Sequence, residues 1–317
     1  MENKNVVTKK YMEDNERFAD LCNFLLFDGQ RVIRPDDLEE QDVTELGIFP
    51  KGKKKGSVEK IRDIQKNCML KRTGDVMYLI IGVENQSEVH YAMAVRNMLQ
   101  DALNYEKQVK IYERMHRRKK DLKGAEFLSG FAKGDKLVPV ITITILWNSG
   151  VWDGARNLHE MFCVQDERVL RFVPDYKLNL IVPEEIEDFE RFSTELGTVL
   201  QICSCASDKN KMKQLLDSRA KEGMYLDLES AEVVNECLNA GIKLPEEEGV
   251  KIDMCKALED WKEELLETGM EKGMEKGREE GKLETLLELT REGILAIEVA
   301  ADKAGISVEE FGKLLEN

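Results

Sequence analysis

Residues 76–105 read VMYLIIGVENQSEVHYAMAVRNMLQDALNY, and this stretch decides the fold. Its first part, positions 77–83, is a near-continuous apolar run, which is typical of a strand buried on both faces. The run ends at the polar residues ENQS, positions 84–87. The residues after them predict a helix, because apolar side chains recur at steps of three and four: Ala92, Val95, Leu99, Ala102 and Leu103.

Glu84 stands at the end of the predicted buried strand. A carboxylate in that position is costly unless a partner satisfies it. It is therefore either a structural acid with hydrogen-bond partners or one half of a metal site. Asp63 precedes it by 21 residues, across one turn and one strand, and a hairpin-like arrangement brings the two acids to one end of the sheet. Oxygen ligands of this kind favour Mg²⁺ or Mn²⁺.

Gln86 lies on the same strand face as Glu84, because strand side chains alternate with period two. Its amide can hydrogen-bond an attacking water or a phosphate oxygen. The bare spacing of Asp63, Glu84 and Gln86 fits a second interpretation, in which Asp63 is a capping residue and Glu84 a hydrogen-bonded structural acid. The spacing alone leaves both interpretations open.

Composition sets the class of protein. The 317 residues are 42% hydrophobic and 34% charged, which indicates a soluble globular protein rich in exposed helix. The first residues contain no apolar segment typical of a signal peptide, and the longest apolar run, 137–147, is too short to cross a bilayer. Seven scattered cysteines indicate reduced thiols. We therefore expect a cytoplasmic protein with no membrane partner.

The net charge of −15 is unevenly distributed. Residues 1–150 hold 26 Lys/Arg and 23 Asp/Glu, a net of +3, which leaves −18 for residues 151–317. Residues 51–72 hold nine basic and two acidic residues, and residues 107–123 hold eight and two. These stretches could hold a polyanion locally even though the whole chain is acidic, or they could be ordinary solvated faces. The DNA-binding candidates are Lys53, Lys54, Lys55, Arg62 and Arg96.

The order of elements favours an α/β fold, with a mixed sheet flanked by helices over residues 1–205. A helix is predicted at 16–27, with Asp14 or Asn15 as N-cap, and Pro183 opens another. Strands are predicted at 44–49, 137–146 and 177–182, with a loop at 51–56. Residues 58–69 fit either a strand or a helix.

An all-helical extension is predicted after residue 205, with an acidic region at 206–268 and a glycine-periodic helix and small helical tail at 269–317. Four glycines recur at steps of four: Gly269, Gly273, Gly277 and Gly281. In a helix they form a smooth stripe suited to a homodimer through residues 269–285. Otherwise they form a flexible charged linker, since each glycine costs a helix about 1 kcal/mol. The tail resembles a helix-turn-helix, but its acidity favours a packing module.

Several motifs resemble the Rpn family of recombination-promoting nucleases, also called YhgA-like transposases, in the PD-(D/E)XK nuclease superfamily. The likeness covers nearly the whole chain. The residues that carry it are Phe18-Ala19-Asp20, Asp42, Arg62-Asp63-Ile64, Glu84-Asn85-Gln86-Ser87, Tyr91-Ala92-Met93, the stretch from Asp101 to Tyr105, and the stretch from Phe172 to Tyr176.

The resemblance implies a restriction-endonuclease-like core and magnesium-dependent cleavage of DNA. Asp63 matches the first acid of the family and Glu84 the second. Gln86 matches the position that is usually lysine, so this chain lacks that positive charge. Either the activity is modest, or the metal together with Arg62 or Arg96 supplies the missing charge. The alternative is a catalytically weak or inactive scaffold protein that self-associates through its C-terminal helices.

Overall fold

The computed structural model describes residues 2–40, 44–51, 54–61, 63–72, 75–219, 222–245 and 249–316. The chain forms two compact units, Met1–Cys255 and Lys256–Asn317. The helices between residues 206 and 255 thus belong to the same unit as the sheet, whereas the sequence pattern predicts divisions at 205 and 268.

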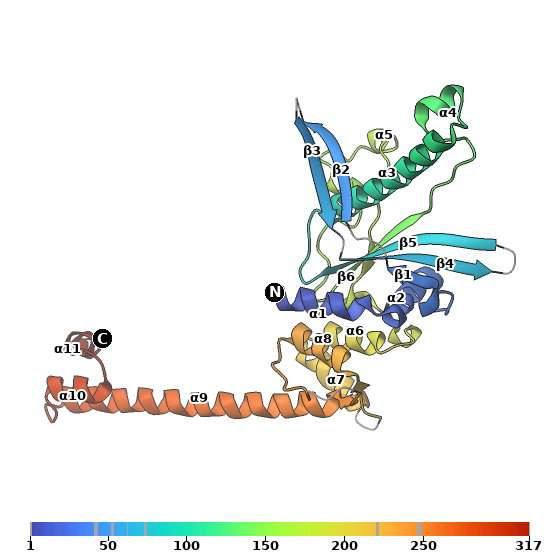
Figure 1. Ribbon diagram of the computed structural model, residues 1–317. Helices are drawn as coiled ribbons and strands as arrows, with labels where there is room; N and C mark the ends of the chain where they lie inside the picture. The colour runs from blue at the N-terminus through green and yellow to red at the C-terminus, as the bar shows by residue number, and fades with distance from the viewer. Residues whose placement is uncertain are drawn as a thin grey trace. The chain divides into compact units, whose positions relative to one another are not determined.

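The first unit is built on a five-stranded mixed sheet (Figure 1). Its order is β1-β4-β5-β6-β7, with antiparallel pairs on the β1 side of β5 and parallel pairs on the other side. The strands are β1 (Leu38–Glu40), β4 (Ile64–Arg72), β5 (Asp75–Gln86), β6 (Val140–Leu146) and β7 (Asn179–Ile181). The prediction of an α/β fold with a mixed sheet and flanking helices is confirmed.

β5 is the central strand because its apolar run can be buried on both faces. Ile81 and Val83 are fully buried, and Ile143 and Ile145 on β6 are as well. Burial starts at Leu79, since Met77 and Tyr78 are about half exposed, at 46% and 52%.

The helices α1 (Glu2–Glu13) and α2 (Asn15–Phe27) cover one face of the sheet (Figure 1). Asp14 caps α2 by accepting from the Glu16 and Arg17 backbone N–H groups, as predicted. The buried Lys66 of β4 joins these helices to the sheet, since its ammonium group donates to the Glu13 carbonyl and to Asn15 Oδ1. Burial lowers the pKa of Lys66.

The long helix α3 (Met93–Lys119) lies on the opposite face, against β5 and β6. Its buried side is mixed: polar Asn97, Gln100, Asp101 and Asn104 lie beside apolar Met93, Ala94 and Leu103. Of the five apolar residues that predict the helix, Leu103 alone is buried, whereas Ala92, Val95 and Ala102 are exposed. Asn97 donates to Thr144 Oγ1 of β6 at 2.9 Å, and Thr142 Oγ1 of β6 donates to Asp101, so hydrogen bonds supplement apolar packing along this interface.

The strands β2 (Thr44–Lys51) and β3 (Lys54–Ile61) form a separate antiparallel pair. The loop prediction for 51–56 is wrong for residues 51 and 54–56, which are strand residues. Residues 52 and 53 lie outside the described residues. The ambiguous stretch 58–69 contains the end of β3 and most of β4, so the helical alternative is wrong. Strand pairing decides this, because hydrogen bonds to a partner strand override an indifferent pattern.

Shorter elements connect these layers. The α-helices are α4 (Gly124–Ser129) and α5 (Glu167–Leu170), and the 3₁₀ turns are η1 (Pro35–Asp37), η2 (His159–Met161), η3 (Pro183–Glu185) and η4 (Phe189–Arg191). Pro183 therefore opens a single 3₁₀ turn and not the predicted longer helix.

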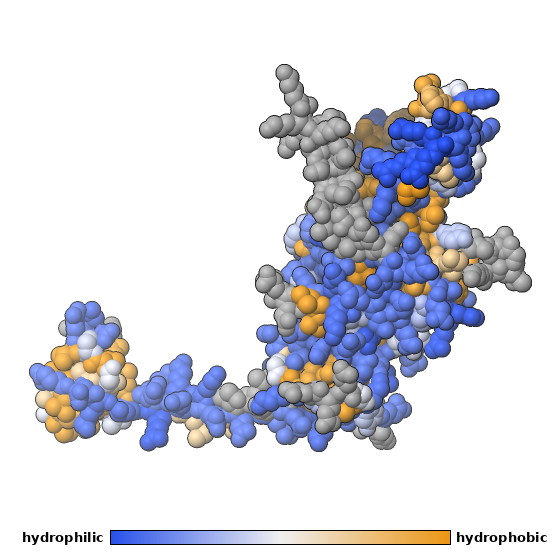
Figure 2. Space-filling view, viewed as in Figure 1, coloured by the Kyte–Doolittle hydropathy of each residue, from blue (hydrophilic) through white to orange (hydrophobic). Residues whose placement is uncertain are grey.

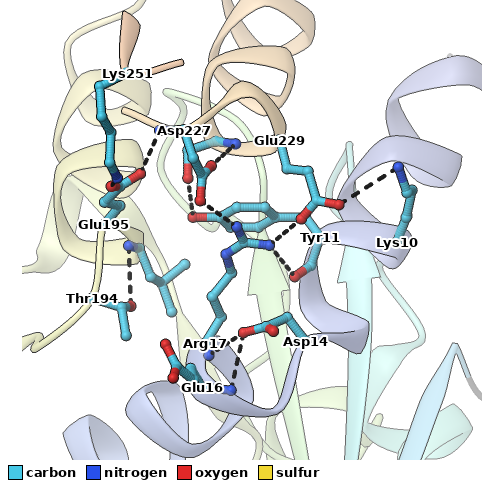
Figure 3. Close-up of polar contacts among 12 residues, drawn as sticks. Lys10, Tyr11, Asp14, Glu16, Arg17, Thr194, Glu195, Asp227, Glu229 and Lys251 are labelled. Carbon is cyan, nitrogen blue, oxygen red and sulfur yellow. Dashed lines mark hydrogen bonds and ion pairs between the residues drawn. The ribbon is translucent and has the colours of Figure 1, made fainter. Parts of the chain in front are cut away.

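A helical layer packs against α1 and α2 (Figure 1). It contains α6 (Leu196–Ser204), α7 (Lys209–Arg219), α8 (Leu228–Leu238) and the small pair β8 (Tyr225–Leu226) and β9 (Ile252–Asp253). Arg17 joins it to the N-terminal helices (Figure 3). Its guanidinium binds Asp227 at 2.7 Å and Glu229 at 2.5 Å, and lies over the Tyr11 ring at 4.2 Å.

The second unit contains most of α9 (Met254–Arg291), followed by α10 (Ile297–Ala304) and α11 (Val308–Glu316). Leu286, Ala300, Ala301 and Phe311 form its core. The glycine-periodic segment is helical, so the linker alternative is wrong. Among the described residues, every helix falls short of the length or the apolarity needed to span a membrane.

Candidate functional site

Asp63 and Glu84 lie at the same end of the β4–β5 pair. Ile64 is in register with Val83, so Asp63 comes one position before that pair and Glu84 one position after it. Asp63 Oδ2 accepts a hydrogen bond from the Asn85 backbone N–H at 2.7 Å. Asp63, directly before β4, is therefore fastened to the end of the central strand beside Glu84.

Glu84 is completely buried but not surrounded by hydrocarbon. Its Oε1 atom accepts from Gln100 Nε2 at 3.0 Å, and its Oε2 atom lies 2.9 Å from a guanidinium nitrogen of Arg96. Both partners stand on α3, four residues apart, so they project from the same side of that helix. The ion pair with Arg96 and the hydrogen bond from the Gln100 amide together offset the cost of burying this carboxyl group.

Asp63 is half-buried and has a perturbed acidity. Burial raises the pKa of its carboxyl group, while the Asn85 N–H, Arg96 and Lys9 act in the opposite direction. Arg96 thus interacts with both acids, by a direct ion pair with Glu84 and through the field that it exerts on Asp63. An acid whose pKa is shifted by burial and which lies beside a charged partner is a common feature of functional sites.

Gln86 is half-buried, two positions after Glu84 on the same face of β5. Its Nε2 atom donates to the Asn85 carbonyl at 2.9 Å, and its amide oxygen retains the capacity to accept from water. Of the predicted DNA-binding residues, Lys53 and Arg62 lie outside the described residues. Lys54 and Lys55 belong to β3, but the structure does not describe their side chains.

Comparison of the chain with protein-family models, with curated proteins and with solved structures gives no match. The function of the cluster must therefore be inferred from its own chemistry and from the sequence motifs.

Two residues that act on the acids, Gln100 by a hydrogen bond to Glu84 and Lys9 by its charge near Asp63, have no counterpart among the predicted site residues. Gln100 belongs to the buried polar side of α3, which the apolar pattern of that helix conceals. Lys9 comes from α1, a helix that the sequence pattern does not predict. Arg96 and Gln100 are four residues apart, and this spacing is the one sequence signal that could have placed Gln100 beside Arg96.

Several motif residues have structural roles instead. Asp101 Oδ1 accepts from Thr142 Oγ1 and its Oδ2 atom from the Tyr176 hydroxyl, both at 2.6 Å, so two distant motifs meet. Asp20 accepts four hydrogen bonds from the backbone and hydroxyl groups of Ser193 and Thr194. Asp20 therefore holds the segment before α6 and is not a third acid of the cluster.

The donor set is compatible with a magnesium ion. Mg²⁺ prefers oxygen ligands and commonly binds through one or two carboxylates, with water and substrate phosphate completing its shell. Asp63 and Glu84 supply two carboxylates. The described residues contain no group of three or more His, Cys, Asp or Glu side chains arranged to hold a metal. The protein alone would therefore contribute a minority of the ligands.

Proposed function

We propose that the unit Met1–Cys255 is a magnesium-dependent DNA endonuclease with a restriction-endonuclease-like core, of the recombination-promoting, transposase-like type. The observation that supports this best is the meeting of Asp63, Glu84 and Arg96 at one end of the β4–β5 pair. The resemblance of the surrounding motifs to the Rpn family points the same way.

Each residue of the cluster has a definite role in this proposal. Asp63 and Glu84 would hold the Mg²⁺ or Mn²⁺ ion, which when bound lowers the pKa of a coordinated water and neutralises charge on the phosphate. Gln86 orients the attacking water or a phosphate oxygen through its amide. Arg96 supplies the positive charge that lysine usually supplies at the position of Gln86.

Gln100 is a positioning residue. Its amide fixes one carboxylate oxygen of Glu84 at 3.0 Å, and the Arg96 guanidinium holds the other. Both partners project from α3, so the orientation of the carboxylate is fixed by a rigid helix and not by a loop.

The decisive experiment measures nicking of supercoiled plasmid DNA with magnesium or manganese. Asp63→Asn is the sharpest variant, because the asparagine carbonyl can still accept from the Asn85 N–H while the charged ligand is lost. We expect Asp63→Asn and Glu84→Gln to reduce the rate at least about a hundred-fold. Glu88→Gln, at an exposed acid four residues beyond Glu84, is the matched control and should cut like the parent.

A second function competes with this one and is supported by one observation. Gln100 and Arg96 satisfy Glu84 without any cation, as a purely structural acid requires. The protein would then be a catalytically weak or inactive scaffold, self-associating as a homodimer through residues 269–285 of α9. A parent protein that cuts nothing would favour this function. Acid variants that fold and cut as fast as the parent would also favour it, because the cutting would then not come from Asp63 and Glu84.

A further inference from the structure

The end of α3 and the segment after it form a small lobe, residues 114–136, here called the α3–α4 lobe (Figure 1). Phe127 and Leu128 of α4 are exposed to 70% and 85%. Figure 2 shows apolar surface at the α4 end of the molecule, next to strongly hydrophilic surface. Two large apolar side chains on so short a helix gain nothing from folding, so their exposure suggests contact with a partner.

The charge of the lobe is basic and open to solvent. Residues 114–136 contain eight Lys/Arg and three Asp/Glu, and all eight basic residues are exposed. The three acids are used inside the lobe: Asp121 and Asp135 bind His116, and Glu126 accepts from the Lys133 N–H. Among the described residues, Arg117 alone of the eight forms an ion pair, with Glu113.

His116 holds the lobe in one arrangement. Its Nδ1 atom lies 2.8 Å from Asp121 and its Nε2 atom 2.9 Å from Asp135, so the ring joins α3 to both ends of the following segment. The hydrogen bond with Asp121 is the largest cause of a raised pKa of His116. Burial lowers this pKa, and the hydrogen bond with Asp135 raises it further, so the protonated ring, which donates from both nitrogens, is favoured. The exposed apolar pair therefore stands on a fixed support.

An open pocket of about 690 Å³ lies between α3 and α4. Phe127 and Leu128 form an apolar wall of this pocket, and the positively charged Arg117 and Lys120 line it as well. A volume of this size suits a ligand as large as a nucleotide. An apolar ring beside two cations matches a base joined to a phosphate.

We propose that the α3–α4 lobe is a docking site for single-stranded or locally unpaired DNA. A base packs against Phe127 and Leu128, and the adjacent phosphates contact Arg117 and Lys120. The proposal extends the proposed function by naming the form of DNA that the protein holds. Arg96 and Lys120 stand on the same helix, so the lobe lies about 36 Å from the acidic cluster at 1.5 Å per residue.

DNA fits this surface better than an anionic membrane does. Helices that lie in a bilayer present a continuous apolar face over several turns, whereas α4 has six residues and two exposed apolar side chains. Stacking against DNA needs only one or two such side chains beside a basic groove.

The test is binding of fluorescent oligo(dT) of about 20 nucleotides to the full chain without divalent metal, so that cleavage plays no part. We expect Phe127→Ala to weaken binding about 5- to 150-fold, the range for loss of one base–aromatic stack. Phe172→Ala is the matched control, since Phe172 is 75% exposed elsewhere in the same unit, and it should bind like the parent.

A charge variant tests the phosphate contacts. Lys120 has φ +53°, a conformation that asparagine tolerates, so Arg117→Gln/Lys120→Asn is the suitable pair. We expect the slope of log affinity against log salt to fall by about 1.4, or 0.7 for each lost contact on a single strand. The matched control is Lys276→Gln/Arg278→Gln on exposed α9.

Three outcomes would overturn the proposal. The first is that the parent fails to bind oligo(dT), and the second is that Phe127→Ala and Phe172→Ala reduce the affinity for oligo(dT) equally. In the third outcome, Phe127→Ala reduces binding to anionic phosphatidylserine vesicles but leaves binding to oligo(dT) unchanged. Failure of the nuclease alone gives a different result. In that case plasmid nicking is absent, while oligo(dT) binding and its dependence on Phe127 persist.

Discussion

At the scale of a single residue, the ionisation of Asp63 affects the stability of the folded protein. Its carboxyl group is half-buried, and burial raises its pKa above the usual value despite the Asn85 N–H, Arg96 and Lys9. An acid with a raised folded pKa costs the native state stability once it ionises. Such a cost is tolerated where the charge has a function, as in metal binding.

We therefore expect Asp63→Asn to be more stable than the parent at neutral pH, measured by urea unfolding with EDTA present. Below the unfolded pKa, about 3.9, the carboxyl is neutral in both states and the difference is small. As pH rises, the unfolded parent ionises first, so the free energy of unfolding of the parent falls relative to the variant. The gap is complete above the folded pKa.

Asp208→Asn is a control for which we expect the opposite change in the free energy of unfolding. The N–H groups of Lys211 and Asn210 lower the pKa of Asp208, so its ionised form stabilises the native state above the unfolded pKa, and this contribution is lost as pH falls. This variant should be less stable than the parent at neutral pH. A less stable Asp63→Asn would mean that the native protein stabilises the Asp63 carboxylate, contrary to its burial.

The sequence pattern predicts part of the candidate site for physical reasons. Glu84 is conspicuous because an acid interrupts a buried run, and a hairpin relates it to Asp63. Gln100 and Lys9 could not be predicted in the same way. Their position depends on which side of α3 faces the sheet and on the docking of α1, and both are set by tertiary packing.

At the scale of an element, the α3–α4 lobe depends on two glycines with positive φ. Gly130 has φ +69°, and a Cβ atom there would lie 2.5 Å from Glu113 Cγ on α3. Gly124 has φ +56°, and a Cβ atom there would meet nothing within 4 Å. A side chain at either position would therefore strain the backbone. Only at Gly130 would it also collide with a residue of α3.

We expect Gly124→Ala to reduce the local stability of the lobe by about 1–2 kcal/mol, the cost of a left-handed alanine. Gly130→Ala should cost more, about 2–4 kcal/mol, because Glu113 must also move. Hydrogen exchange of the amides in residues 121–136 measures both changes. Equal effects of the two substitutions would contradict the close packing of α4 on α3.

Elements with strong local signals were predictable and those made by tertiary contacts were not. α2 has an Asp14 cap and a stop at Asp28, and β5 and β6 have apolar runs, so all three follow from the sequence. α1 has few apolar residues, yet Tyr11 and Met12 are fully buried against neighbouring elements. The helix therefore depends on packing rather than on its own amphipathic pattern.

At the scale of the whole molecule, charge separates along the chain. Residues 1–150 carry a net of +3 and residues 151–317 a net of −18. A polyanion such as DNA is therefore attracted to a few basic surfaces of residues 1–150 and repelled by the acidic residues 151–317. Binding should depend on a few side chains, which is why single substitutions in the α3–α4 lobe can test it.

The last prediction concerns self-association through α9. A Cβ atom on Gly273 or Gly277 would meet nothing within 4 Å, so both positions can accept alanine within the single chain. Each alanine should strengthen the helix by about 1 kcal/mol. If a second copy packs on this stripe, however, two added methyl groups hold the helices apart.

We expect Gly273→Ala/Gly277→Ala to raise the helix stability of α9 while weakening the homodimer at least about ten-fold in sedimentation experiments, since close helix approach depends on small residues. Glu271→Ala/Glu275→Ala alters exposed neighbours in the same two turns and should leave the dimer intact. A parent that stays monomeric at every concentration, or a glycine variant that associates as the parent does, would leave the glycine repeat without a role in assembly. The combination of a stiffer helix and a weaker dimer is the specific sign that the stripe is a contact surface, because propensity alone predicts the first change without the second.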